Sequence, residues 1–291
     1  MSDAAAPEDD GARDLAADLH IALACLDRAA EISVPGWLGD RTPTRKADGS
    51  PVTETDIACE EAIRALLAAE RPADGVYGEE RPTTAGDSGW QWVIDPIDGT
   101  SNFTRGMPVW ATLIGLVSPQ GRPVVGAVGA PALGMRWWAH DGGPAYHTAP
   151  LQQAPKPIAV SHVDSLERAY ASVAIGENGR AADPRTLADG SAIDMLAIEA
   201  AIARRVWRLR GLGDFLAHLL VAQGALDIAI DTPGLAPYDV AALVPIVTAA
   251  GGRMTTFDGA ADYAHGTAMS TNGHLHAAAQ GALAAACRTS E

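Results

Sequence analysis

The sequence contains few cysteines and no apolar run that could cross a membrane. Its three cysteines, Cys25, Cys59 and Cys287, are far apart and lack C-x-x-C spacing, which argues against a disulfide framework or a zinc site. A membrane-spanning helix needs about 18–20 apolar residues, and no run reaches that length. Residues 1–11 are acidic and show neither the basic nor the apolar stretch of a signal peptide. We expect a disordered acidic tail, a reducing cytoplasm and no membrane partner.

Positive charge is also scarce. The chain carries 21 Lys and Arg residues against 36 Asp and Glu residues, a formal net charge of −15. A protein that binds nucleic acid would show a basic face, so we expect no such partner. An anionic ligand would need bound cations to supply positive charge. With 291 residues, 47% of them apolar, the chain can bury a sizeable core.

Helix and strand patterns divide the chain into two halves. Residues 12–154 open with two amphipathic helices, the first ended by Val34–Gly36, and continue with β-rich segments that predict an antiparallel meander. Residues 155–291 alternate strands with helices, which predicts an α/β arrangement. The expected helices span 14–32, 53–69, 192–203, 213–222, 237–250 and 275–286. The expected strands span 75–80, 91–95, 108–117, 122–128, 135–140, 145–147, 158–163, 169–175, 205–209, 226–230 and 253–257.

The stretch Gln91–Phe103 offers groups that bind a cation and an anion together. Three bulky β-formers precede Asp95-Pro96, and proline suits the start of a helix but not a strand interior. Asp95 and Asp98 therefore leave a strand end on nearly the same side. The backbone N–H groups of the following short helix have no partner within it, which suits a phosphate. The stretch indicates a metal-bridged phosphate site, and a plain strand–turn–helix corner with aspartate as a helix cap is the alternative.

Two more acids could complete a cation site. Glu79 follows Gly78 at an expected strand end, and Asp239 lies in an expected first helical turn. Locally, Glu79 could equally be a solvated loop acid and Asp239 a helix cap. If the four carboxylates converge, they cannot all ionise without a cation. Ligands that are all oxygen favour Mg²⁺, and two ions would clamp both oxygens of a phosphoryl transfer.

Competing motifs are incomplete. Gly211-Leu212-Gly213 follows an expected strand and opens a helix, as in a dinucleotide fingerprint, but Leu216 replaces its third glycine. Asp214 would also face the pyrophosphate. The sequence contains no Gly-x-Ser-x-Gly elbow and no Walker Gly-Lys-Ser/Thr.

Four segments together resemble the inositol monophosphatase-like, metal-dependent phosphatases. Trp92–Phe103 is similar to the signature of that family, and Gly78-Glu79-Glu80 is similar to its upstream metal-binding box. Tyr238–Ala242 resembles its Trp-Asp-x-Ala box, with Tyr238 in the Trp position, and Lys46 with Pro51–Asp56 resembles its N-terminal element. The resemblance implies a layered αβαβα sandwich of the inositol monophosphatase and fructose-1,6-bisphosphatase type, and a homodimer.

The same resemblance implies the metal ligands. Glu79, Asp95 and the carbonyl of Ile97 would hold one Mg²⁺. Asp95, Asp98 and Asp239 would hold a second, and a third, weaker ion would lie near Glu79. The implied cofactor is thus two to three Mg²⁺ ions per site.

The resemblance also implies catalytic roles. Glu79 and Thr100 would position and deprotonate the attacking water, and Asp56 would support Thr100. Water held near Asp98 would protonate the leaving alkoxide. The phosphate would lie on the backbone N–H groups of Gly99, Thr100 and Ser101.

Within the family, the chain most resembles the bacterial histidinol-phosphate phosphatases. The segments that carry this likeness include Arg105–Trp110, Arg136–Trp138 and Leu220–Ala229. Ser101, where those enzymes often have Lys, and Tyr238 depart from the pattern. The implied reaction hydrolyses L-histidinol phosphate to L-histidinol and phosphate. Phosphatases of inositol 1-phosphate or of other small sugar or nucleotide phosphates, including one in secondary metabolism, stay open, as does a non-catalytic family member.

Three further residues are expected to bind the substrate, two of them at the leaving group. Asp214 opens a helix and Asp231 ends a strand, so both could face an ammonium group such as that of histidinol. Arg210 is expected to pair with one of these acids. Helix cap and loop acid are the alternative interpretations of Asp214 and Asp231.

Overall fold

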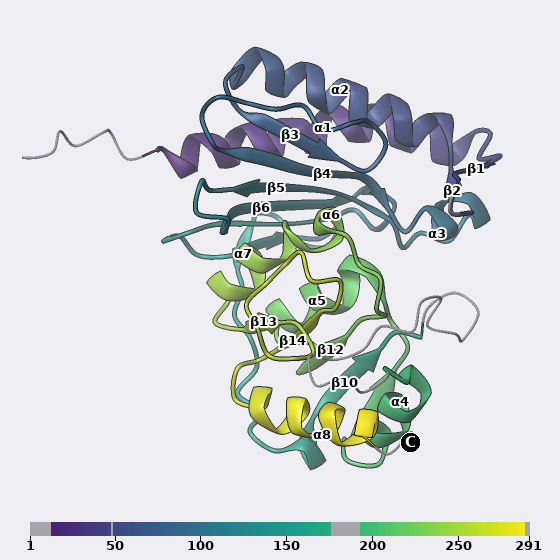
Figure 1. The fold of residues 1–291 in the computed structure, drawn as a ribbon, viewed down its shortest axis with the longest axis vertical. Coiled ribbons are helices and arrows are strands. Elements are labelled where there is room, and N and C mark those ends of the chain that lie inside the picture. The colour runs from purple at the N-terminus through teal and green to yellow at the C-terminus, as the bar shows by residue number, and fades with distance from the viewer. Residues whose placement is uncertain (1–12, 48, 176–192, 289–291) are drawn as a thin grey trace, which may run out of the picture.

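The computed structural model describes residues 13–47, 49–175 and 193–288. The tail expected at residues 1–11 lies outside these ranges. Two sheets and three layers of helices alternate through the molecule (Figure 1). The predicted αβαβα sandwich is therefore confirmed.

The first sheet has seven strands in sequence order, from β3 to β9. β3 and β4 are parallel, and every later neighbour is antiparallel, which confirms the predicted meander. The seven strands are β3 (Gly75–Gly78), β4 (Gln91–Asp98), β5 (Ala111–Val117), β6 (Pro123–Ala130), β7 (Met135–His140), β8 (Tyr146–Thr148) and β9 (Lys156–Pro157).

Two long helices, α1 (Leu15–Leu38) and α2 (Glu54–Glu70), cover one face of this sheet (Figure 1). Asp14 caps α1, and Thr53 and Asp56 form a capping box on α2. The prediction that α1 ends at Val34–Gly36 is wrong, because the helix continues through Pro35. Val34 and Trp37 pack against the buried Trp110 cluster, which offsets the hydrogen bond that proline removes.

The second sheet has five strands in the order β11, β10, β12, β14 and β13. Helices α5 (Asp214–Ala222), α6 (Pro237–Val240) and α7 (Leu243–Ala249) fill the space between the sheets, and α4 (Met195–Ala203) and α8 (His276–Arg288) cover the outer face (Figure 1). The strands are β10 (Tyr170–Val173), β11 (Arg208–Arg210), β12 (Ile228–Ile230), β13 (Arg253–Thr255) and β14 (Met269–Thr271). Outside the two sheets lie the hairpin of β1 (Thr44–Arg45) and β2 (Pro51–Val52), the short helix α3 (Thr100–Arg105), and two 3₁₀ turns at Pro131–Leu133 and Leu166–Arg168.

Two expected elements of the second half differ from the structure, and one strand of the second sheet was not expected. Residues 158–163 form no strand, because Val160 donates its N–H to the Ala250 carbonyl beyond α7. The helix expected at 237–250 is divided into α6 and α7 where Ala242 lies against Gly126 of β6. Strand β14 was not expected, since three residues show no recognisable alternation. No helix in the described ranges is long and apolar enough to cross a membrane.

Candidate active site

The bulge at the end of β4 brings two aspartates to one side. Strand β4 runs to Asp98, whereas we expected it to stop at Asp95. Asp95 pairs with Leu113 and Asp98 with Ala111, so three steps on β4 match two on β5. Residues three apart on a regular strand face opposite sides, and the extra residue turns both carboxylates the same way.

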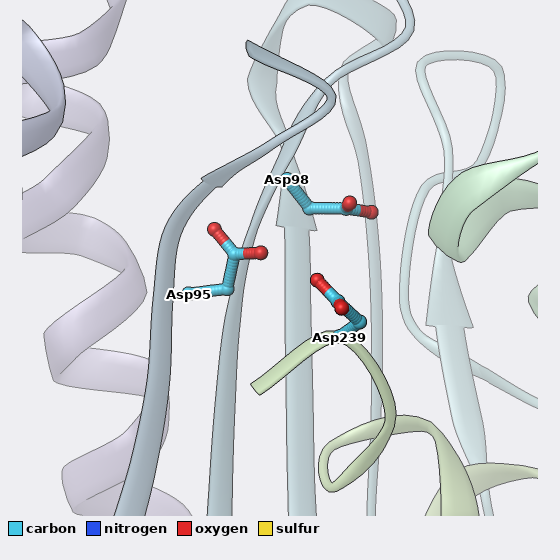
Figure 2. A group of neighbouring side chains, drawn as sticks. All are labelled: Asp95, Asp98 and Asp239. Carbon is cyan, nitrogen blue, oxygen red and sulfur yellow. The ribbon is translucent and has the colours of Figure 1, made fainter. Parts of the chain in front are cut away.

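Asp239, on α6, completes a cluster with these two residues. One carboxylate oxygen from each of Asp95, Asp98 and Asp239 lies within 4.8 Å of the other two. Figure 2 shows the three side chains as neighbours, with Asp95 and Asp98 on β4 and Asp239 on α6. The predicted convergence of these three acids is thus present in the structure.

Hydrogen bonds hold two of the carboxylates and leave an oxygen of the third open. Asp98 Oδ2 accepts from the Phe215 N–H at 2.9 Å, and Asp239 Oδ2 accepts from the Ala236 N–H at 2.6 Å. Asp95 Oδ1 is buried and accepts no hydrogen bond from the described residues. A buried oxygen without a donor is costly, and a cation between the carboxylates would satisfy it.

Burial and mutual repulsion disfavour ionisation of the cluster. Burial, aided by the charges of Glu79, Asp98 and Asp239, raises the pKa of Asp95 well above its ordinary value. Burial and the neighbouring acids do the same for Asp98, and they raise the pKa of Asp239 to about 7. Oxygen ligands in this number and state fit a hard divalent cation, which would restore the ionised form.

Glu79 lies beside the cluster rather than within the group of three. Its Oε1 accepts from Lys46 Nζ at 2.7 Å, and the same ammonium group donates to Glu80 at 2.7 Å. Burial raises the pKa of Glu79, although Lys46 opposes the shift. Lys46 therefore holds both carboxylates of the Gly78-Glu79-Glu80 segment at the edge of the candidate metal site.

Thr100 opens α3, directly after Gly99. Its Oγ1 lies 3.0 Å from the Ile97 carbonyl and 3.3 Å from Asp56 Oδ1. Asp56 is buried on α2, where it also accepts from the Thr53 N–H and hydroxyl. Burial raises the pKa of Asp56. The predicted link from Asp56 to Thr100 is thus a contact between α2 and α3.

The N-terminus of α3 faces a large cleft. Gly99 adopts a left-handed conformation (φ 81°) and offers no capping side chain to the helix. The cleft, about 590 Å³ in volume, is lined by Glu79, by Gly99, Thr100 and Ser101 at the start of α3, and by Asp214 at the start of α5. The first turn of α3 can therefore present backbone N–H groups to an anion in the cleft.

Asp214 lines this cleft beside α3, and Asp231 is buried close to it, since a Cβ atom on Gly213 would lie 3.9 Å from Asp231 Oδ1. Asp214 has a φ of 55°, the one positive value among the non-glycine residues described, and its Oδ2 accepts from Asn102 Nδ2 at 3.2 Å. Asp231 is buried, with Oδ2 3.5 Å from His218 Nε2. A strained backbone at a cleft residue indicates a functional position.

Arg210 is at a different place. It lies on β11 at the edge of the second sheet, where its guanidinium is 5.1 Å from the ring centre of Tyr170. The residues that line the cleft do not include it. Asp231 forms no ion pair with Arg210 in the described part of the chain, because its contacts are to His218 and Thr232. A pairing with Asp214 stays a prediction.

Three supporting residues were not identified from the sequence: Glu60, Asn102 and His218. Asn102 bridges Asp214 and the Val109 carbonyl, and His218 lies between Asp231 and Ser270. These contacts join segments far apart in the sequence, so no local pattern marks them. Glu60, four residues after Asp56, shares its helix face, and that spacing could have been noticed.

A sequence model of the "Inositol monophosphatase family" matches residues 21–291. The chain belongs to this family. The histidinol-phosphatase of Mycobacterium tuberculosis is 42% identical over 89% of the chain and 95% of that protein. The histidinol-phosphatase of Streptomyces coelicolor is 41% identical over 89% of the chain and 94% of that protein.

A solved structure supports the same family assignment. The inositol monophosphatase of Thermotoga maritima superposes with a TM-score of 0.78 at 26% identity, over 94% of the chain and 99% of that protein. The chain is thus a phosphatase of the inositol monophosphatase family, a metal-dependent family, and its acidic cluster could bind metal. The predicted family and enzyme class are confirmed.

Proposed function

We propose that the protein is a Mg²⁺-dependent hydrolase of L-histidinol phosphate, which releases L-histidinol and phosphate in histidine biosynthesis. The observation that carries the metal chemistry is the group of three neighbouring carboxylates, in which the buried Asp95 Oδ1 accepts no hydrogen bond from the described residues. The substrate assignment draws on the two relatives named histidinol-phosphatase, each matched over more than nine-tenths of its length. A cytoplasmic homodimer and a division into halves at 12–154 and 155–291 belong to the same proposal.

Five residues would hold two to three Mg²⁺ ions. Asp95, Asp98 and Asp239 form the cluster, and Glu79 and the Ile97 carbonyl, which lies 3.0 Å from Thr100 Oγ1, would complete the ligand set. Mg²⁺ bound there supplies Lewis acidity toward the phosphoryl oxygens and lowers the pKa of water. The all-oxygen ligand set favours this ion over zinc.

The residues of the chain supply position and proton transfer. The backbone N–H groups of Gly99, Thr100 and Ser101 hold the phosphate at the start of α3, where negative charge grows during transfer. Glu79 and Thr100 orient the attacking water and accept its proton. Asp56 and Lys46 orient these two groups through the contacts described above. Water beside Asp98 returns a proton to the leaving alkoxide.

The acids beside the start of α3 favour a cationic leaving group. Histidinol carries an ammonium group, and Asp214 in the lining of the cleft, with Asp231 buried close to Gly213 of that lining, would provide negative charge toward it. A neutral polyol would gain less from these charges. Inositol 1-phosphate and other small sugar or nucleotide phosphates remain the second candidates, since Ser101 and Tyr238 depart from the histidinol-phosphatase pattern beside the metal site.

A phosphate-release panel tests this proposal. The purified protein is assayed with histidinol phosphate, inositol 1-phosphate, fructose 1,6-bisphosphate and adenosine 3′,5′-bisphosphate, each in Mg²⁺ and in EDTA. In Mg²⁺ we expect the highest kcat/KM for histidinol phosphate. In EDTA we expect no phosphate release from any of the four substrates. A higher kcat/KM for inositol 1-phosphate would overturn the substrate assignment, and full activity in EDTA would overturn the metal assignment.

A further inference from the structure

Glu60 is a fully buried acid behind the metal site that the catalytic scheme does not use. It lies on α2 one turn after Asp56 and is 0% exposed. Its Oε2 accepts from the Glu80 N–H at 2.6 Å, and its Oε1 accepts from the Arg81 N–H at 3.2 Å. Arg64 Nε donates to Oε1 at 2.7 Å. The carboxylate therefore binds the backbone directly after Glu79.

The end of β3 is shaped to admit this carboxylate. A Cβ atom added to Gly78 would overlap both carboxylate oxygens of Glu60, so the absence of a side chain at Gly78 makes room for them. Arg64 also donates to the Arg81 carbonyl, at 3.2 Å. Glu60 and Arg64 together thus bind both the N–H and the C=O of Arg81.

The turn at residues 78–81 is consequently held from two sides. Glu60 binds its backbone from α2, and Lys46 binds the side chains of Glu79 and Glu80 from the hairpin β1–β2. We propose that Glu60 is a positioning residue that fixes this turn and so aims the Glu79 carboxylate at the cation site. This inference rests on the proposed Mg²⁺-dependent function.

A purely structural ion pair between Glu60 and Arg64 is the alternative, and the two roles predict different measurements. A structural pair affects the melting temperature alone, whereas a positioning residue also affects Mg²⁺ affinity. Glutamine at residue 60 would keep the size but offer one acceptor oxygen to three donors, with its NH₂ group facing N–H groups. Loss of a group that orients metal ligands typically weakens metal affinity by about 10–100-fold.

The experiment is calorimetric titration of the metal-free protein with Mg²⁺, alongside thermal unfolding in EDTA. Glu60→Gln is compared with Glu61→Gln, an exposed neighbour whose side chain pairs with Arg81. We expect the Mg²⁺ Kd to rise at least about tenfold in Glu60→Gln and to be unchanged in Glu61→Gln. The KM for histidinol phosphate at saturating Mg²⁺ should stay unchanged in both.

An unchanged Mg²⁺ Kd with a lowered melting temperature in Glu60→Gln would overturn the inference. If that variant does not fold, Gly78→Ala replaces it, because its methyl group displaces the same carboxylate. An unchanged Mg²⁺ Kd with a lowered melting temperature in Gly78→Ala would then overturn the inference. A wild-type protein that binds Mg²⁺ but leaves histidinol phosphate intact would overturn the substrate assignment only. A wild-type protein that binds no Mg²⁺ would overturn the proposed function.

Discussion

Removal of divalent cations should make the stability of the protein depend strongly on pH. In the folded protein the pKa values of Asp95, Asp98 and Asp239 are raised, chiefly by burial. A raised carboxyl pKa means that the folded state binds its proton more tightly than the unfolded state. Stability is therefore full below the unfolded pKa and is lost as pH rises through the folded pKa.

Asp239 provides the magnitude. Its pKa is raised from 3.8 to about 7, and between these values the free energy of unfolding falls by about 1.4 kcal/mol per pH unit. About two pH units of this range lie above pH 5. Asp239 therefore lowers the free energy of unfolding by about 3 kcal/mol between pH 5 and pH 8. This is a large share of the 5–15 kcal/mol that typically stabilises a native protein.

Comparison with Asp239→Asn isolates this contribution. Burial lowers the pKa of His276 from 6.5 to about 4. Between these two values this histidine makes the free energy of unfolding rise with pH, which is opposite to the effect of Asp239. Because this histidine is present in both proteins, its effect cancels in the difference. In EDTA we expect the free energy of unfolding of Asp239→Asn, measured relative to that of the wild type, to increase by about 3 kcal/mol between pH 5 and pH 8.

Urea unfolding, followed by tryptophan fluorescence at several pH values, measures the free energy of unfolding of each protein. Measurements in EDTA give its pH dependence, and measurements in excess Mg²⁺ give the stabilisation by the cation. Mg²⁺ should stabilise the wild type at pH 8 and Asp239→Asn much less, since the cation favours the ionised carboxylates. A difference between the two proteins that does not change with pH in EDTA would refute the pKa argument. An equal response to Mg²⁺ would refute the assignment of Asp239 as a ligand.

Three other substitutions test the site. Asp95→Asn should abolish turnover and weaken Mg²⁺ binding while circular dichroism stays unchanged, and wild-type turnover would contradict its assignment. Gly99→Ala should lower kcat in steady-state assays, because the left-handed backbone (φ 81°) resists a side chain and the methyl would lie 3.0 Å from the Val109 carbonyl. Asp214→Asn should raise the KM for histidinol phosphate about tenfold, equivalent to about 1.4 kcal/mol. The KM for glycerol 2-phosphate, which has no ammonium group, should stay unchanged. An equal rise for both esters would contradict the role of Asp214 toward the ammonium group.

The sequence predicted elements best where they bury one face of a long segment. The expected helix 53–69 is α2 (Glu54–Glu70), and the expected strand 135–140 has the bounds of β7. Both show a clear period of apolar residues. β14 and the break between α6 and α7 depend on contacts with distant segments, which a local pattern does not contain.

The site shows the same division. The convergence of Asp95 and Asp98 was expected from a strand that ends early, whereas the structure achieves it through a bulge in a longer strand. The prediction was correct for the side chains and wrong for the backbone, since a bulge leaves no mark in residue type alone. Glu60 was missed because an acid on an amphipathic helix ordinarily faces solvent.

The distribution of basic residues explains why the site depends on cations. Among the described residues, basic side chains pair with acids at the edge of the site: Lys46 binds Glu79 and Glu80, and Arg64 binds Glu60. In the same part of the chain no Lys or Arg pairs with the three central acids, Asp95, Asp98 and Asp239. An internal lysine or arginine there would stabilise the metal-free fold but occupy the position of the cation. Within the described residues, the fold therefore leaves these three carboxyl groups without a basic partner where the proposed chemistry requires Mg²⁺.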